Sequence, residues 1–257
     1  MVSFERLSEI THLNLPAALC IVIETKGSTP RKPGSKMVVF PDGSVHGKIE
    51  GTIGGGAVEH QIRTEAIQVI ALEKSKVVTL SLTHDLGMCC GGEMTVFIET
   101  LLPKPHCIIF GAGHIGEVLS RLAAQAGFFV TVADARKDLM QLERLPYAHQ
   151  LLTNYTRNEL DQLPFGPNTF IIVATHDHQK DQELVEAILV KSFRYAALVG
   201  SKRKAKMTIT RCLNKGLDPQ QVAKLHCPAG VAIDAETPEE IAFSIVAQMI
   251  QYRRKKP

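Results

Sequence analysis

Two different patterns of apolar and polar positions divide the chain. In the first hundred residues, short β-rich runs surround one amphipathic segment whose apolar residues recur at helical spacing. The elements predicted there are a helix at 4–11, a strand at 17–24, a hairpin at 37–45 that turns at 41–43, a helix at 57–74, and strands at 76–82 and 93–99. The N-terminal part is therefore expected to be a small α+β domain.

After residue 105, short apolar runs alternate with helical stretches. The runs read CIIF, FFVTVA, FIIVA and YAALVG, and such alternation is typical of βαβ units in a parallel sheet. The last helix begins with a capping box, in which Thr237 precedes Pro238 and Glu240 stands three residues after Thr237. The pattern predicts an α/β protein, with a C-terminal Rossmann-like doubly wound parallel sheet preceded by the smaller α+β domain.

The segment at 100–105 separates the two patterns. Its two prolines disfavour both a helix and a central strand, so we predict a linker there. This divides the chain into domains at 1–101 and 102–257, and 257 residues suffice for two ordinary domains.

Composition and charge narrow the class of protein. With 45% hydrophobic and 21% charged residues, the chain is neither fibrous nor disordered. The longest apolar run, at 15–23, is about half of a membrane span, and the six cysteines lack the spacing of a disulfide scaffold. We expect a cytoplasmic protein with reduced thiols and no membrane or nucleic-acid partner. Residues 1–103 carry 9 basic and 11 acidic side chains and residues 104–257 carry 20 and 15, so an anion is expected in the C-terminal part.

A glycine-rich turn follows the first strand of the C-terminal domain. Between that strand and the next helix stand Gly111, Gly113, His114 and Gly116. Glycines at this spacing allow a tight turn, close approach of a pyrophosphate and close packing of the helix, which is typical of dinucleotide binding. Asp134 ends the next strand and would hold a ribose diol, whereas Arg136 and Lys137 could take a 2′-phosphate instead. The type of nucleotide therefore stays open.

Two more segments are expected at the same edge of the sheet. Thr175 and His176 open the run THDHQKD, whose histidines and aspartates could chelate a metal, although an ordinary helix start is favoured. Ser201 is the expected N-cap of a helix whose first turn contains Lys202 and Arg203. Cations are unfavourable there unless an anion binds, so a phosphate site and a solvated basic turn stay open.

The N-terminal domain has its own candidate residues. Three glycines directly precede the amphipathic helix and can present backbone N–H groups to an anion, with an acidic residue in the first turn: Gly54, Gly55, Gly56 and Glu59. Arg31 stands in a loop of small polar residues and could pair with a phosphate or a pterin edge. Cys90, followed by Gly91 and Gly92, could act as a soft metal ligand or in sulfur transfer, or could be an inert turn thiol.

Seven segments together resemble the XdhC/CoxI family of xanthine dehydrogenase accessory proteins. They are GSTPRKPGSKMVV, GTIGGGAVEHQI, GMCCGGEMTVFIE, FGAGHIGEVLSRLAAQAGFFVTVADAR, ATHDHQKDQELV, GSKRKAKM and TPEEIAFSI. The resemblance implies a maturation factor that binds molybdenum cofactor, as molybdopterin or its dinucleotide form. Such a factor supports sulfuration by a cysteine desulfurase or sulfurtransferase and inserts the cofactor into a xanthine dehydrogenase-type hydroxylase. The family's cysteine before Gly-Gly falls on Cys90, the candidate molybdenum ligand, and its GGG-x-x-E block falls on Gly54 to Glu59.

The resemblance therefore predicts a cofactor-handling protein, assembled as a homodimer, rather than an enzyme with its own turnover. The alternative is an NAD(P)-dependent oxidoreductase, because Gly116 completes the strict dinucleotide pattern. Its general acid would have to be His114 or His176, and neither position is specific for that role.

Overall fold

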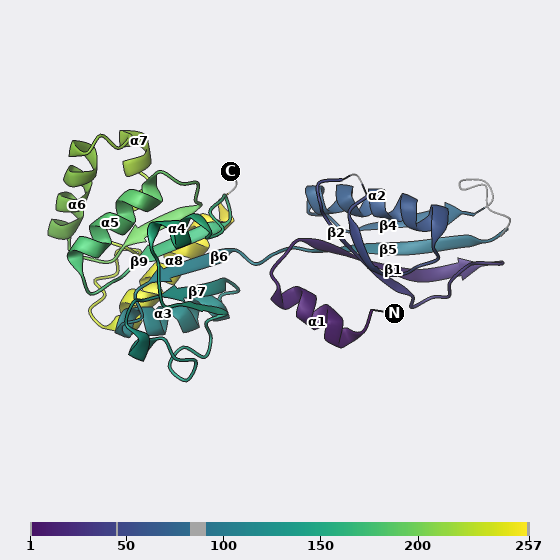
Figure 1. Cartoon of the computed structure of the whole chain (residues 1–257), viewed down its shortest axis with the longest axis horizontal. Coiled ribbons are helices and arrows are strands. Elements are labelled where there is room, and N and C mark those ends of the chain that lie inside the picture. The colour runs from purple at the N-terminus through teal and green to yellow at the C-terminus, as the bar shows by residue number, and fades with distance from the viewer. Residues whose placement is uncertain (1, 45, 83–90, 256–257) are drawn as a thin grey trace. The chain divides into compact units, whose positions relative to one another are not determined.

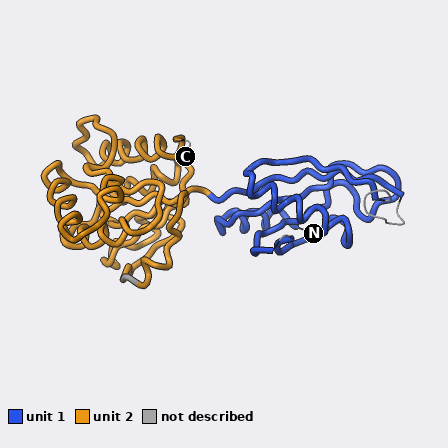
Figure 2. Tube along the Cα trace, turned by 90° about the horizontal axis from the view of Figure 1, so that it is seen from above, with its two compact units in different colours: residues 1–103 blue, residues 104–257 orange. Residues whose placement is uncertain are grey.

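The computed structural model describes residues 2–44, 46–82 and 91–255. The chain forms two compact units, Met1–Pro103 and Lys104–Pro257, so the division lies two residues after the expected one (Figure 2). Unit 1 contains α1 (Phe4–His12), β1 (Ala17–Lys26), β2 (Lys36–Phe40), β3 (Lys48–Gly51), α2 (Gly56–Leu72), β4 (Lys76–Ser81) and β5 (Glu93–Leu101).

Unit 1 is an antiparallel sheet with one helix on each face (Figure 1). The strand order is β3-β2-β1-β5-β4. On α2, the buried residues recur at helical spacing and pack against the sheet; they are Val58, Ile62, Ala66 and Val69. Ile10 of α1 packs with Leu19 and Val38 on the opposite face. The prediction of an α+β domain is confirmed.

The predicted hairpin at 37–45 is wrong in its second strand. β2 ends at Phe40, and the strand that pairs with it begins only at Lys48. Polar contacts hold the connection: Asp42 Oδ1 accepts hydrogen bonds from the backbone N–H and the hydroxyl of Ser44. Arg63 of α2 donates to the carbonyls of His46 and Gly47. These contacts extend the loop beyond the short turn that the sequence indicated.

Unit 2 has a six-stranded sheet in which every pair of neighbouring strands is parallel. The strand order is β11-β10-β9-β6-β7-β8, so the direction of winding reverses between β6 and β9. Its elements are β6 (His106–Phe110), α3 (His114–Gln125), β7 (Phe129–Ala133), η1 (Lys137–Leu139), β8 (Gln150–Leu152), α4 (Arg157–Asp161), β9 (Thr169–Val173), α5 (His178–Leu189), β10 (Tyr195–Leu198), α6 (Lys202–Asn214), α7 (Pro219–Val222), β11 (Leu225–His226) and α8 (Pro238–Arg254).

The strands of this sheet are buried on both faces. Along β6, Cys107 and Ile109 pack with α3 and α8, whereas Ile108 and Phe110 face the α5 side. This explains the continuous apolar runs in the sequence. The capping box of α8 is present, because Thr237 accepts a hydrogen bond from the Glu240 backbone N–H and the Glu240 carboxylate accepts one from the Thr237 N–H. The predictions of a doubly wound parallel sheet and of this helix start are confirmed.

No helix among the described residues is long and apolar enough to cross a membrane.

His106 opens β6 in a half-buried aromatic cluster. Its Nε2 lies 2.7 Å from Thr131 Oγ1, and its ring meets Phe129 edge-on at 5.0 Å between centroids. Burial, and then the nearby His149, lower the pKa of His106 from 6.5 to about 4. The native state therefore favours the neutral imidazole.

The free energy of unfolding should fall as the pH is lowered from about 6.5 to about 4, because the unfolded chain then binds a proton that the native chain does not. The shift corresponds to at most about 3 kcal/mol. Urea unfolding of the full chain at pH 7 and pH 4.5 measures it. His106→Gln should flatten the dependence, while His12→Gln, an exposed control in unit 1, should not. Equal pH dependence in the two variants would contradict this assignment.

Candidate functional site

The carboxyl ends of the parallel strands of unit 2 bring the connecting segments to one edge of the sheet. Ligands of open α/β sheets bind at this edge, in the crevice where the winding reverses, here between β6 and β9. The segments that follow β6, β7, β9 and β10 carry the predicted residues Gly111, Gly113, His114, Gly116, Asp134, Arg136, Thr175, His176, Ser201, Lys202 and Arg203.

The three glycines of the turn after β6 have different physical roles. Gly111 has a φ of +119°, and a Cβ there would lie 2.2 Å from the Ala174 carbonyl oxygen. At Gly116 a Cβ would lie 1.9 Å from the Gly111 carbonyl oxygen, so α3 packs directly on the turn. Beside Gly113, by contrast, no described atom lies within 4 Å of the position a Cβ would take. Two glycines therefore serve packing, and Gly113 leaves open space.

That open space lies at the start of α3. Gly113 is the N-cap, and no side chain caps this helix. The backbone N–H groups of a first turn have no partner within their own helix, and the helix dipole adds partial positive charge. The arrangement can hold an anion that approaches the backbone closely.

Asp134, at the end of β7, is engaged within the chain. Its side chain is 3% exposed. Oδ1 accepts hydrogen bonds from Arg136 N and Nε at 3.0 Å each, and Oδ2 accepts them from Ala112 N at 2.8 Å and Arg136 Nη2 at 2.6 Å. Burial alone would raise its pKa, but these donors outweigh burial and lower the pKa of Asp134 to about 2. Four bonds fill the acceptor sites of a carboxylate, so none remains for a ribose diol, which is one of the two groups that the sequence left open here.

The segment after β9 is tied to α6 by a second inward-turned carboxylate. Asp181 of α5 is buried, and its Oδ1 accepts hydrogen bonds from the backbone N–H and the hydroxyl of Thr175, at 3.1 Å and 2.7 Å. Its Oδ2 lies 2.5 Å from Lys204 Nζ, which also donates to the Val199 carbonyl at 2.9 Å. The sequence showed both charged residues but not their pairing, which joins segments 23 residues apart.

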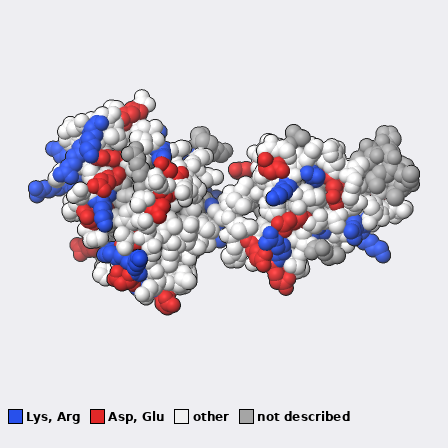
Figure 3. Space-filling model, in the orientation of Figure 1, with Lys and Arg blue, Asp and Glu red and all other residues white. Residues whose placement is uncertain are grey.

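The positive charge of the first turn of α6 is thus only partly neutralised by acidic side chains of the protein. Ser201 is the N-cap, as predicted, and its hydroxyl accepts a hydrogen bond from Lys204 N. Lys204 of this turn is neutralised inside the protein by Asp181. The phosphate site that is one of the two interpretations of this turn stays a prediction. Lys202 and Arg203 are exposed and form no ion pair with another described residue. Figure 3 shows Lys and Arg side chains gathered over α6.

The described residues contain no group of three His, Cys, Asp or Glu side chains that could hold a metal ion. His114 and His176 are both exposed at the sheet edge. Cys90, the candidate molybdenum ligand, lies outside the described residues.

In unit 1, Glu59 holds the glycine turn that precedes α2. Its Oε1 accepts hydrogen bonds from Thr52 Oγ1 at 2.5 Å and from the N–H groups of Gly55 and Ile53 at 2.9 Å and 3.2 Å. Burial acts to raise its pKa, but these bonds prevail and lower it. The Oε1 atom of Glu59 thus organises its own loop, and the role of this residue in binding a cofactor stays a prediction.

The remaining predicted residues of unit 1 divide into packed and open positions. A Cβ on Gly54 would lie 2.9 Å from Pro30, and one on Gly92 would lie 2.3 Å from the Ser28 carbonyl oxygen. Gly92 therefore allows close packing of the backbone. At Gly55, Gly56 and Gly91, no other described residue beyond the chain neighbours lies within 4 Å of the position a Cβ would take. Arg31 is exposed, and its guanidinium makes no hydrogen bond with another described residue.

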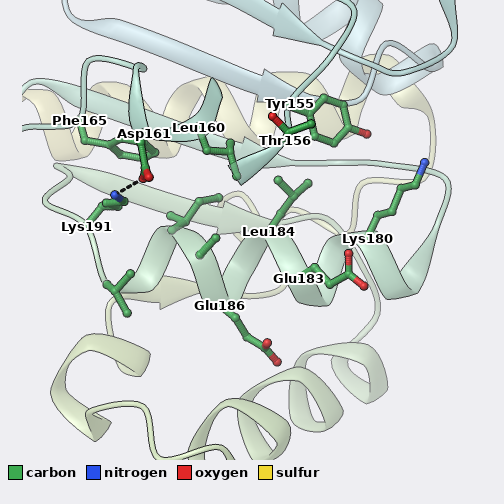
Figure 4. A pocket seen from close by; sticks show the side chains of 13 residues that line it. Tyr155, Thr156, Leu160, Asp161, Phe165, Lys180, Glu183, Leu184, Glu186 and Lys191 are labelled. Atoms are coloured by element: carbon green, nitrogen blue, oxygen red, sulfur yellow. Dashed lines mark hydrogen bonds and ion pairs between the residues drawn. The ribbon is translucent and has the colours of Figure 1, made fainter. Parts of the chain in front are cut away.

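A pocket of about 650 Å³ lies beside α5 and was not predicted from the sequence (Figure 4). Apolar side chains of Leu160, Phe165 and Leu184 line it, with Lys180 and Glu183 at its rim. Its wall includes Tyr155, whose ring meets Phe110 at 5.7 Å, and burial and then the Asp134 carboxylate raise the pKa of this tyrosine. Tyr155 thus lies between the pocket and the crevice. It follows β8, which is too short to be recognised from periodicity.

Six parallel strands in this order, with an open glycine turn where the winding reverses, define a Rossmann-type protein with a crevice suited to an anionic ligand. Residues 107–249 match the XdhC Rossmann domain, and residues 12–81 match the XdhC and CoxI family. The chain belongs to this family. The first match contains every candidate residue of unit 2, and Cys90 lies between the two matched ranges.

The chain is also similar to individual proteins. The chain is 31% identical over 259 residues to the uncharacterized protein YqeB of Escherichia coli, covering 99% of this chain and 47% of that protein. It is 36% identical over 160 residues to a probable xanthine dehydrogenase subunit of Bacillus subtilis, covering 62% and 46%. The chain thus spans about half the length of these curated relatives. A crystal structure of a xanthine dehydrogenase from Bacillus halodurans shares the fold, with a TM-score of 0.55, 24% identity and coverage of 100% and 97%.

The glycine turn makes a matched pair of variants. Gly116→Ala should lower the free energy of unfolding by about 1–3 kcal/mol, although alanine favours helices, because its Cβ meets the Gly111 carbonyl. Gly113→Ala should cost less, about 0.5–1 kcal/mol, because its Cβ enters open space at an ordinary φ and only the preference of an N-cap for glycine over alanine is lost. Thermal melts compare the two variants. A Gly116 variant as stable as the parent would refute the packing role.

Proposed function

We propose that this chain is an accessory protein that binds molybdenum cofactor, supports its sulfuration and inserts it into a xanthine dehydrogenase-type hydroxylase. The observation that carries the proposal is the open space at Gly113, before the uncapped start of α3. Membership of the XdhC and CoxI family and the name of the Bacillus subtilis relative support it.

The crevice residues fit the phosphate-bearing end of such a cofactor. A phosphate could accept hydrogen bonds from the backbone N–H groups behind Gly113, where a Cβ would otherwise intrude. Arg203 and Lys202 on α6 add positive charge that no described side chain neutralises. When bound, the cofactor would supply the molybdenum centre and the sulfido ligand that the hydroxylase requires. The residues of unit 2 would bind and orient its phosphate.

Cys90 is proposed to contact the molybdenum end or the incoming sulfur. This part of the proposal rests on the sequence, because Cys90 lies outside the described residues. A thiolate is a soft ligand that suits a soft, sulfur-bound metal. Gly91, next to it, has no described neighbour within 4 Å of its Cβ position.

The direct test is purification from cells that make molybdenum cofactor, followed by metal analysis and fluorescence of the oxidised pterin. Stoichiometric pterin is the expected result. An alternative activity, an NAD(P)-dependent oxidoreductase, is favoured by the dinucleotide-type glycine turn alone. Bound NAD(P) without pterin would support that alternative and overturn the proposal.

Charge reversal on α6 tests the anion site. Arg203→Glu should weaken the binding of molybdopterin about fivefold, because it places a negative charge at the helix start near the phosphate. Lys206→Glu makes the same charge change one turn further along and should have a smaller effect. Titration followed by pterin fluorescence gives both affinities. Equal affinities in the Arg203 variant and the parent would remove α6 from the site.

Cys90→Ala should lower the retention of sulfurated cofactor and the activation of the hydroxylase, because the soft ligand is lost. Cys89→Ala is the matched control and should do much less. Bound molybdenum, released pterin and activation of the hydroxylase are measured beside a thermal melt. Equal activation by the Cys90 variant and the parent, at equal stability, would eliminate the thiol role.

A further inference from the structure

The Asp134–Arg136 pair closes the position at which a Rossmann sheet ordinarily holds a ribose diol. A diol binds there by donating its hydroxyl protons to the carboxylate. In this chain both oxygens of Asp134 already accept two hydrogen bonds each, three of the four from Arg136. A diol would have to displace Arg136 from a carboxylate that is 3% exposed, and a buried charge left without its partner is strongly unfavourable.

The same pair offers a ligand hydrogen-bond donors of Arg136 in place of the carboxylate acceptors of Asp134. Arg136 uses Nε and Nη2 for Asp134, and its Nη1 makes no hydrogen bond with another described residue. Its side chain is 34% exposed, so solvent and ligands can reach part of it. A guanidinium has five N–H groups in a planar fork that matches a phosphate. Asp134 holds this fork by two side-chain bonds and so orients it in advance.

The surroundings of Arg136 also favour an anionic ligand whose oxygen atoms accept hydrogen bonds. Tyr155 lies close enough to Asp134 and Arg136 for both charges to affect it, and its hydroxyl is a further donor. Asp138 is the other acidic group near Arg136, and it is exposed on η1. Ala112 N, bonded to Asp134, belongs to the glycine turn itself. Arg136 and the start of α3 are therefore joined through one carboxylate.

We propose that the end of β7, in the crevice of unit 2, distinguishes between two chemical groups of a ligand. It binds a phosphate monoester and rejects a ribose 2′,3′-diol. Arg136 is the residue that determines this selectivity. The inference rests on the proposed function, in which this crevice holds the phosphate-bearing end of a cofactor, and it names the chemical class that the crevice accepts.

NADP⁺ and NAD⁺ are suitable probes, because they differ only by a 2′-phosphate in place of the free diol. Calorimetric titration of the full chain should show NADP⁺ binding at least about tenfold more tightly than NAD⁺, as expected for one charge-assisted bidentate contact. Arg136→Ala should abolish that preference, both by weakening NADP⁺ and by freeing Asp134 for the diol of NAD⁺. Arg211→Ala, which removes an exposed arginine from the last turn of α6, should keep the preference.

A second variant keeps the proposal testable if Arg136→Ala fails to fold. Asp134→Asn keeps an acceptor for Ala112 N and frees Arg136 from its acidic partner, so the preference for NADP⁺ should persist or grow. Equal affinities for NAD⁺ and NADP⁺ in the parent, or no binding of either at millimolar concentration, would overturn the selectivity. A preference that survives in Arg136→Ala would overturn the role of Arg136. Pterin retention by the parent is measured separately, so failure of the proposed function remains distinguishable.

Discussion

The crevice of unit 2 depends on one buried carboxylate, that of Asp134, which holds both the half-buried Arg136 and the backbone of the glycine turn. A buried charge is stable only when its partners stay in place. The pair therefore fixes Ala112, which stands between the packed Gly111 and the open Gly113. Because Gly116 packs on the same turn, the start of α3 is held against the ends of β6 and β7. The space beside Gly113 is a consequence of these contacts.

A carboxylate that accepts hydrogen bonds from its own loop is also found at two other helix starts. Asp181 holds Thr175 and Lys204, and Glu59 holds Thr52 and the glycine turn of unit 1. In each case an acidic residue near a glycine- or threonine-containing turn accepts hydrogen bonds from its own loop. Acidic residues that look functional in the sequence thus fix loop geometry, while the open positions are glycines and basic side chains.

Periodicity predicted the parallel sheet because strands buried on both faces leave continuous apolar runs, as in β6 and β9. Capping chemistry predicted α8, since Thr237 and Glu240 interact within one turn. The sequence did not reveal β8 or β11, which have three and two residues and no period to detect. Nor did it reveal the Asp181–Lys204 pair or the pocket beside Tyr155, because those contacts join segments that only the tertiary fold brings together. Local interactions are visible in a sequence, whereas pairings across the sheet edge are not.

The distribution of paired and unpaired charge explains how such a crevice can both attract and choose a ligand. Asp134 and Asp181 each neutralise one basic residue, which leaves Lys202 and Arg203 in the first turn of α6 without ion pairs among the described residues. Their field is positive but reaches only about 8–10 Å at ordinary ionic strength. Charge can therefore concentrate anionic ligands near the edge without distinguishing among them. The choice falls to contacts at short range: the space at Gly113, which only a close-fitting group can use, and the donors of Arg136, which a phosphate satisfies and a diol does not.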